Sequence, residues 1–299
     1  MKSLLLERTA RSIVLIRRGS QTWGAIVPLF CYPRKCARHV LTGEYPNFLR
    51  LASLSILGPC VLLLAFSARA QTADVAKEAQ RLTRVAQVAQ QEGRYDDAIK
   101  AYQTITVVAA REPRIAAAAQ LNAGNIHLAR GNYQEAVAAF QHSIKLDGNS
   151  AEAQNNLGEA LGELKQYPRA LEAFQQAVGL DGGFLKARYN MGVTYDRLGQ
   201  LKYSEFVYRL LIRDHPDFAL AYDGLAVSLS KSGRARDAIA LHQRAISLEP
   251  KDASFYYNFA VSYLVLGEFK KAQEQQQRLR DLDPAMAEHL ATVIAKHQR

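Results

Sequence analysis

Cysteine is missing from most of this chain. Its three cysteines, Cys31, Cys36 and Cys60, all precede residue 70 of the 299. The remainder can form neither an internal disulfide nor a cysteine metal site, so packing alone must hold its fold. A body without cysteine also suits an oxidising compartment, because it carries no thiol that could be oxidised.

A strong positive charge is also missing from the body of the chain. The formal net charge is +10, but residues 1–70 hold 10 Lys and Arg against 2 Asp and Glu, a net charge of +8. From Gln71 onward the net charge is only +2. The basic pI therefore reflects the N-terminal segment, and it gives no reason to expect nucleic-acid binding.

The motifs of catalytic and metal sites are missing too. The sequence has no His-x-x-x-His pair, no glycine-rich phosphate loop after a strand, and no strand pattern. His127 and His242 fall at core positions of helical stretches, which favours packing over ligation. Ser150, Ser204 and Ser228 have no His and Asp partners at a suggestive spacing. We therefore expect no enzyme, no cofactor and no metal ion.

One apolar run stands out in the N-terminal segment. Residues 47–70 read NFLRLASLSILGPCVLLLAFSARA, in which Arg50 leads an uncharged run and small residues Ala68 and Ala70 close it. This order is typical of a secretory signal peptide. The run is short for a membrane-spanning helix, which needs about 20 residues. We expect cleavage near Ala70 and a periplasmic or secreted protein; the alternative is an uncleaved, single-pass inner-membrane anchor.

The extension before this signal, residues 1–46, is rich in arginine and poor in acidic residues. It has three interpretations. The first is that the start is assigned too early, with initiation near Val40 or Leu41. The second is a two-part organelle transit sequence, and the third is a disordered basic tail. The first is favoured because the signal is complete without the extension.

From residue 79 to residue 286 the chain repeats itself. The turn residues at one register are spaced by 38 residues once and then by 34 residues four times: Gly93, Gly131, Lys165, Gly199, Gly233 and Gly267. Each unit holds two stretches with apolar residues at helical spacing, such as Leu157 and Leu161, joined by a short turn. Four extra residues around Pro113 account for the longer first spacing. A fixed period of this length is typical of a stacked repeat array.

Two series of small residues accompany this period. The first helical stretch of each unit carries Ala86, Gly124, Gly158, Gly192, Ala226 and Ala260. The second opens with Ala98, Ala136, Ala170, Ser204, Ala238 and Ala272. With both series in register, the array resembles the tetratricopeptide repeat (TPR) family. Six units match, here numbered repeats 1 to 6: 79–112, 117–150, 151–184, 185–218, 219–252 and 253–286.

The resemblance implies an all-α fold: a right-handed solenoid of antiparallel helix pairs whose first helices line a concave groove. Residues 71–78 would lead into it, and residues 287–299 would form a capping helix over the last repeat. Gly158 then has a packing role, because the two helices of a unit cross closely at that residue. Gly162 has no such role; on the groove side, its missing side chain would leave room for a ligand.

A series of amides marks the expected groove. Counted from the first residue of each repeat, position 6 reads Arg84, Asn122, Asn156, Asn190, Gly224 and Asn258. The series resembles the asparagines in the repeat superhelix of the enzyme that attaches N-acetylglucosamine to intracellular proteins, where amides hold an extended peptide by its backbone. An amide can both donate to and accept from a peptide unit. The alternative is that these asparagines make contacts between repeats, with no ligand implied.

Tyr189 and Tyr257, each directly before an asparagine of the series, could stack on the same ligand. The sequence thus predicts a non-catalytic scaffold that binds a peptide or partner protein in the groove through the four asparagines and these two tyrosines. The alternative is a membrane-anchored component of envelope assembly that self-associates. Nucleic acid is not an expected partner, and the oligomeric state stays open.

The signal peptide can be tested directly. N-terminal sequencing of the protein recovered from the exported fraction of a bacterial host should begin at Gln71, because the small residues Ala68 and Ala70 suit a signal peptidase. A membrane-bound product that retains residues 47–70 would contradict cleavage and favour the anchor.

Overall fold

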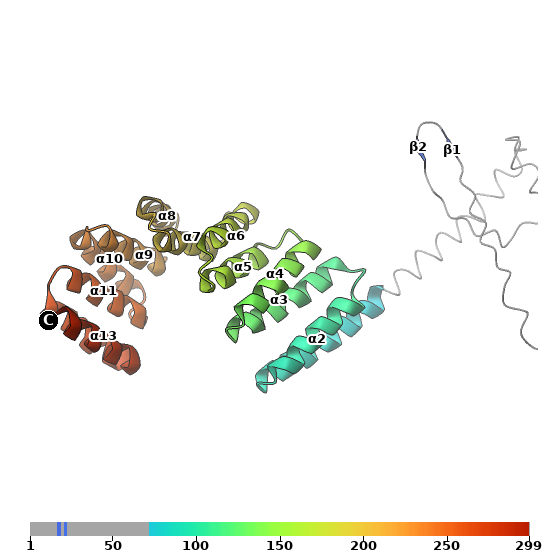
Figure 1. Cartoon of the computed structure of the whole chain (residues 1–299), viewed down its shortest axis with the longest axis horizontal. Coiled ribbons are helices and arrows are strands. Elements are labelled where there is room, and N and C mark those ends of the chain that lie inside the picture. The colour runs from blue at the N-terminus through green and yellow to red at the C-terminus, as the bar shows by residue number, and fades with distance from the viewer. Residues whose placement is uncertain (1–16, 19–20, 23–71, 299) are drawn as a thin grey trace, which may run out of the picture. The chain divides into compact units, whose positions relative to one another are not determined.

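The computed structural model describes residues 17–18, 21–22 and 72–298 (Figure 1). The signal segment, residues 47–70, lies outside the described residues, as does nearly all of the extension before it. The predictions of cleavage, membrane anchoring and export therefore stay predictions. Among the described residues, no helix combines the length and apolar character needed to cross a bilayer.

The chain divides into two compact units, Met1–Gln71 and Thr72–Arg299. In the first unit, β1 (Arg17–Arg18) and β2 (Gln21–Thr22) pair antiparallel, with Arg17 opposite Thr22 and Arg18 opposite Gln21. Strands of two residues carry no hydrophobic face of their own, and the expectation of an all-α fold concerns the second unit.

The second unit is built from helices joined by short turns. A helix over residues 72–91 comes first. It is followed by α2 (Tyr95–Val108), α3 (Pro113–Ala129), α4 (Tyr133–Leu146), α5 (Ala151–Glu163), α6 (Tyr167–Leu180), α7 (Leu185–Arg197), α8 (Leu201–Asp214), α9 (Ala219–Lys231), α10 (Ala235–Leu248), α11 (Ala253–Val265), α12 (Phe269–Leu282) and α13 (Pro284–His297).

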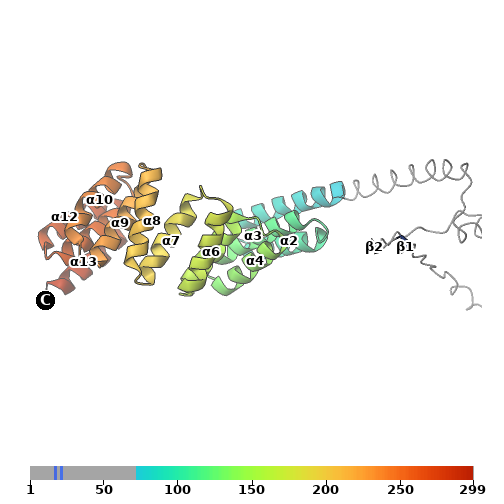
Figure 2. The same ribbon diagram turned by 90° about the horizontal axis from the view of Figure 1, so that it is seen from above.

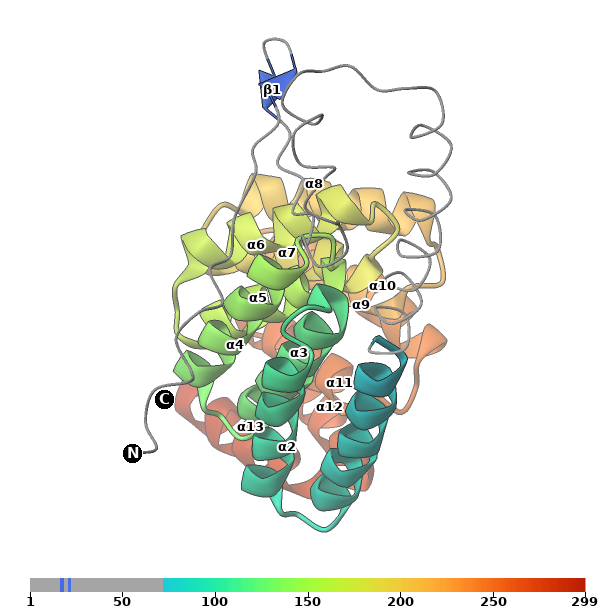
Figure 3. The same cartoon turned by 90° about the vertical axis from the view of Figure 1, so that its right-hand side faces the viewer.

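These helices stack into a solenoid. Each packs against the next along the chain, and α7, α9, α11 and α13 also contact one another in succession. In Figure 1 they form an arch, with α5, α7 and α9 on its inner side and α6, α8 and α10 on its outer side. Figure 2 shows the stacking from above, and in Figure 3 α2 and α3 lie side by side. The prediction of an all-α solenoid is confirmed.

The helices follow the predicted period closely. In repeats 3 to 6 the first helix begins at the first residue of the repeat, namely Ala151, Ala219, Ala253 and, in repeat 4, Leu185. The four extra residues near Pro113 lengthen α3 by one turn, since proline is well tolerated at the start of a helix. At the ends, residues 72–78 extend the first helix upstream of repeat 1, and α13 covers repeat 6.

The turns inside the repeats share one backbone conformation. The five turn glycines have φ between 71° and 82°. Lys165, with φ of 59°, is the one non-glycine among the described residues that has a positive φ. The Lys165 N–H donates to the carbonyl oxygen of Gly162, and the Gln166 N–H donates to the carbonyl oxygen of Leu161, both at 2.9 Å. These two hydrogen bonds cap the C-terminal end of α5. A Cβ costs about 1–2 kcal/mol in this conformation, so repeat 3 tolerates strain where the other repeats use glycine.

The two helices of a repeat meet at a small residue on the first helix. A Cβ built on Gly158 would lie 2.6 Å from the Phe174 ring, and one on Gly124 would lie 2.5 Å from Phe140. Such distances are too short for any carbon contact, so the ring occupies the space that glycine leaves. At Gly162 a Cβ would meet nothing within 4 Å. The packing role expected of Gly158 is thus visible, whereas Gly162 borders open space.

This difference gives a matched pair of substitutions. Gly158→Ala should lower the free energy of unfolding by about 1–3 kcal/mol, because the new methyl group displaces Phe174. Gly162→Ala should raise it by about 0.5–1 kcal/mol, because alanine favours the helix and meets no neighbour. Urea denaturation followed by circular dichroism measures both, and midpoints that move in the same direction would contradict the packing assignment.

Candidate binding groove

The predicted amides lie on the first helices of their repeats. Asn122 is on α3, Asn156 on α5, Asn190 on α7 and Asn258 on α11. Asn156 is buried, and the other three are half-buried. Their positions are equivalent, but their hydrogen bonds differ, and these bonds decide what each amide can offer a ligand.

A chain of carboxamides connects repeats 2, 3 and 4. Asn156 Nδ2 donates to Asn125 Oδ1 at 2.8 Å, and Asn155 Nδ2 donates to Asn156 Oδ1 at 3.0 Å. Asn190 Nδ2 then donates to Asn155 Oδ1 at 3.1 Å. Each step from one repeat to the previous one uses the amide nitrogen at position 6 as the donor.

Glu159 fixes the orientation of this chain. Its Oε1 accepts from Asn155 Nδ2 at 2.7 Å and from Asn190 Nδ2 at 3.1 Å, and it pairs with Lys186 Nζ at 2.8 Å. An ionised carboxylate can only accept, so both amides must turn their nitrogens toward it. The Oδ1 atom of Asn190 consequently faces away from Glu159 and makes no hydrogen bond with the described residues.

A second polar cluster joins repeats 5 and 6. Asn258 Nδ2 donates to Asp223 Oδ2 at 2.7 Å, and His242 Nδ1 lies 2.8 Å from Asp223 Oδ1. On the other side of the imidazole, His242 Nε2 lies 2.9 Å from Ser262 Oγ, which lies 2.8 Å from Ser230 Oγ. Because the carboxylate accepts, Nδ1 is a donor, and in the neutral imidazole Nε2 accepts the proton of Ser262.

This cluster has the Ser-His-Asp order of a hydrolytic triad but not its accessibility. Ser262, His242 and Asp223 are 1%, 0% and 4% exposed, so a substrate carbonyl has no path to the hydroxyl. The His242 ring instead packs at a tilt against the Phe259 ring, with centroids 5.2 Å apart, and fills the place that an aromatic ring occupies in repeats 1 to 4. The packing role predicted for His242 is confirmed.

Among the described residues, no group of three or more His, Cys, Asp or Glu is arranged to hold a metal ion.

Repeat 5 lacks the asparagine for a steric reason. A Cβ on Gly224 would lie 2.6 Å from the ring of Tyr208, which projects from α8 of the preceding repeat. Burial raises the pKa of Tyr208 far above its usual value, consistent with a phenol held in the core. The gap in the amide series therefore follows from where the Tyr208 ring lies, against the backbone of Gly224.

Both predicted tyrosines are engaged within the array. The Tyr189 ring lies 5.9 Å from that of Tyr208 and 6.1 Å from that of Phe218, and burial raises the pKa of Tyr189 to about 12. The Tyr257 hydroxyl lies 3.1 Å from His289 Nδ1, and the two rings stack 5.8 Å apart. Tyr257 thus ties α11 to α13. Stacking of either ring on a ligand stays a prediction.

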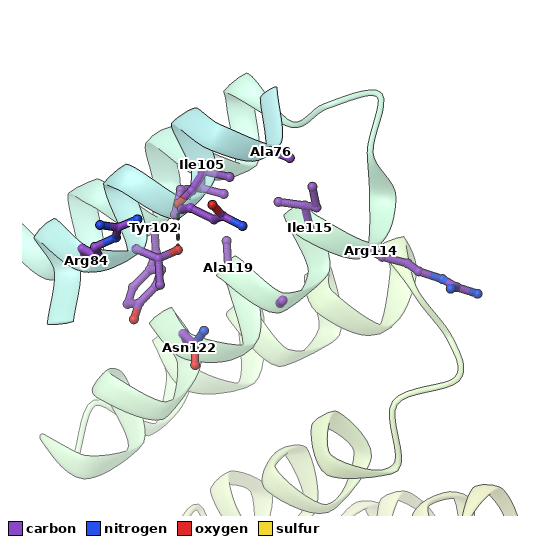
Figure 4. Close-up of a pocket in the computed structure, with 12 residues that line it drawn as sticks. Ala76, Arg84, Tyr102, Ile105, Arg114, Ile115, Ala119 and Asn122 are labelled. Atoms are coloured by element: carbon purple, nitrogen blue, oxygen red, sulfur yellow. Dashed lines mark hydrogen bonds between the residues drawn. The ribbon is translucent and has the colours of Figure 1, made fainter. Parts of the chain in front are cut away.

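The remaining member of the series, Asn122, lines an open pocket. This pocket, of about 610 Å³, lies between the helix over 72–91 and α3, and it reaches Tyr102 and Ile105 on α2. Figure 4 shows Arg84 at one end and Arg114 at the other. Neither arginine forms an ion pair with the described residues, and the Asn122 side chain makes no hydrogen bond with them. The pocket therefore offers free donors beside an apolar floor.

Sequence comparison identifies the family. Profiles of the tetratricopeptide repeat match residues 78–149, 115–182 and 229–296, together more than half of the chain. The chain belongs to the TPR family. A search of curated proteins finds no match.

Solved TPR structures share the fold. A TPR protein from Parabacteroides merdae ATCC 43184 aligns with a TM-score of 0.65 at 18% identity, covering 74% of this chain and 87% of its own. PilW, a type IV pilus biogenesis factor, aligns at 0.60 and 21% identity, covering 72% and 98%. One structure of MamA aligns at 0.50 and 26% identity, covering 57% and 97%. TPR proteins are in general non-catalytic scaffolds for protein–protein interaction.

The structure of this TPR array separates two roles that the sequence offered together. Asn156, Asn190 and Asn258 each make the contact between repeats that was given as the alternative interpretation. Binding of a ligand by the series stays a prediction. Asp223 was not predicted as the partner of His242. The signal in the sequence is that repeat 5 has polar residues at positions 5 and 24, and repeat 6 has serine at position 10.

Two asparagines of the series should differ in their effect on stability. Asn258→Ala removes a donor from the buried Asp223 carboxylate and should lower the free energy of unfolding by about 1–3 kcal/mol. Asn122→Ala breaks no hydrogen bond and should change it by less than about 0.5 kcal/mol. Thermal and urea denaturation compare the two variants; equal losses would contradict the assigned contacts.

Proposed function

We propose that this TPR protein is a non-catalytic scaffold that binds an extended polypeptide of a partner protein along its first helices. The observation that carries the proposal is the open pocket between repeats 1 and 2. There the position-6 side chains Arg84 and Asn122 stand beside an apolar floor, with no partner among the described residues. A site with free donors and apolar surface fits a peptide better than it fits a uniformly charged polymer.

The hydrogen bonds of the series set what such a polypeptide must supply. The Nδ2 atoms of Asn190 and Asn258 already donate to side chains of the preceding repeat. Only their Oδ1 atoms, which accept hydrogen bonds, are left for a ligand. A backbone N–H of the ligand is the matching group. Asn122 can pair with both the N–H and the C=O of one peptide unit. Each such bond contributes about 0.5–1.5 kcal/mol, so affinity would come from several repeats together.

The lining next to the series changes along the array. Position 9 is polar in repeats 2 and 3, with Asn125 and Glu159, and apolar in repeats 4 to 6, with Val193, Val227 and Val261 half-buried. A polypeptide with a polar half and an apolar half would match this change in one direction only. The proposal therefore includes a fixed orientation of the bound segment.

The proposal also places the scaffold outside the cytoplasm. Residues 47–70 have the order of a signal peptide, and no cysteine follows Cys60. Both features support export of the array, either free or tethered.

Peptides selected from a random library by affinity for the chain would test the groove. Arg84→Ala and Asn122→Ala should each weaken the selected peptides by about 3- to 10-fold, because each removes hydrogen bonds of the pocket. Fluorescence anisotropy measures the dissociation constants. Arg169→Ala, which removes an exposed arginine from α6, is the matched control and should leave binding unchanged. Peptides that bind both pocket variants as tightly as the native chain would contradict the proposal.

A further inference from the structure

Two aromatic side chains are exposed on α8. Tyr203 and Phe206 are each 61% exposed, although aromatic rings of this size are normally buried in a stable core. They stand one helical turn apart, on the second helix of repeat 4. That helix lies on the outer side of the arch, away from the first helices that form the proposed groove (Figure 1).

The other five repeats show what the fold itself needs at these positions. At position 19, where repeat 4 has Tyr203, they have Asp97, Glu135, Arg169, Asp237 and Lys271. At position 22, where repeat 4 has Phe206, they have Lys100, Ala138, Glu172, Ala240 and Glu274. Five repeats with the same helix pair do without an aromatic ring at either position. The solenoid therefore does not require Tyr203 and Phe206 for its packing.

The apolar surface continues on both sides of these rings. Tyr195, on α7, stacks on Tyr203 with centroids 5.5 Å apart. Leu210, four residues after Phe206 on α8, is half-buried. We call Tyr195, Tyr203, Phe206 and Leu210 the α8 patch. Its members on α8 follow the spacing by which one helix presents a ridge to another.

Two arginines lie next to the α8 patch along its helix: Arg209 follows Phe206 by three residues, and Arg213 follows Leu210 by three. Glu205 pairs with both Arg209 and Arg234, at 2.8 and 3.3 Å. Asp214 likewise pairs with both Arg188 and Arg213, at 3.2 and 2.8 Å. Two carboxylates are thus each shared by two guanidinium groups.

One further positive charge lies next to the α8 patch. Lys202, exposed beside Tyr203, has no ion pair within the part of the chain that the structure describes. Arg234 also pairs with Asp237, at 2.9 Å. Four arginines are thus bound by three carboxylates, so with Lys202 the border of the patch keeps an excess of positive charge and can accept negative charge from outside.

We propose that the α8 patch is a second docking surface, which binds an acidic amphipathic helix of a partner protein. Apolar side chains on one face of that helix would cover Tyr203 and Phe206. Its flanking carboxylates would pair with Lys202 and with the arginines that share Glu205 and Asp214. Tyrosine and arginine are the residues that contribute most at protein interfaces. Because the patch is on the outer side, it can be occupied while the groove holds its own ligand.

A designed peptide is a suitable probe. It has about 18 residues, with leucines spaced by three and four and glutamates between them, so that it forms an acidic amphipathic helix. A peptide with lysine in place of each glutamate is the charge control, and vesicles of phosphatidylglycerol and phosphatidylcholine test a membrane surface. Fluorescence anisotropy and vesicle sedimentation are measured with the full chain.

The variant combines Tyr203→Asp with Phe206→Ala, which gives α8 the residues that α10 has at the same positions, Asp237 and Ala240. Circular dichroism should therefore show an unchanged fold. Val107→Asp, which removes an apolar side chain that is 76% exposed on α2, is the control for general hydrophobicity.

The acidic peptide should bind the native chain and the Val107→Asp variant alike, and the double variant at least about tenfold more weakly; the lysine peptide should not bind. Equal binding by the double variant would overturn the proposal. So would binding of the vesicles in place of the peptide, or self-association of the native chain that the double variant abolishes.

Discussion

The structure depends on the close approach of two helix backbones in each repeat. At Gly124, Gly158 and Gly192 the missing side chain leaves space for one aromatic ring of the second helix, and that ring fixes how the helices cross. Because each repeat contacts only its neighbours, the same crossing repeated along the chain sets the spacing between successive first helices. That spacing brings an amide at position 6 within hydrogen-bonding distance of the repeat before it.

Where a polar side chain replaces the aromatic ring of the second helix, the side chains around it are polar as well. His242 takes the place of the ring in repeat 5, and Asp223, Ser262 and Asn258 supply every hydrogen bond that the imidazole and the carboxylate need. A buried polar network stabilises a fold only when all its members are satisfied, and each of these side chains has a partner. Gln276 follows the same logic in repeat 6, since its Nε2 donates to the carbonyl oxygen of Ala287 and so joins α12 to α13.

The period in the sequence was sufficient to predict the helix pairs and the turn positions. The C-terminal helix was expected from the repeat-family resemblance over residues 287–299, and in the structure it begins three residues earlier, at Pro284. The period could not predict whether each asparagine faces a ligand in the groove or binds the preceding repeat. Position 6 lies where the groove meets the preceding repeat, and a carboxamide suits both a peptide and a neighbouring side chain. Which group each asparagine binds depends on residues 31 and 35 positions earlier, Asn125 for Asn156 and Asp223 for Asn258. A comparison of position 6 alone does not include these partners.

Repetition makes each departure from the pattern interpretable, because the other repeats show what the fold requires. Gly224 departs from the asparagine series, and the ring of Tyr208 explains it. His242 departs from the aromatic series, and Asp223 explains it. Tyr203 and Phe206 depart from the charged and small residues of the outer face, and apart from the stacking of Tyr195 on Tyr203 the described residues contain no neighbour that accounts for them. Departures that a neighbour explains belong to the fold, and a departure that leaves two aromatic rings in water points to a partner outside it.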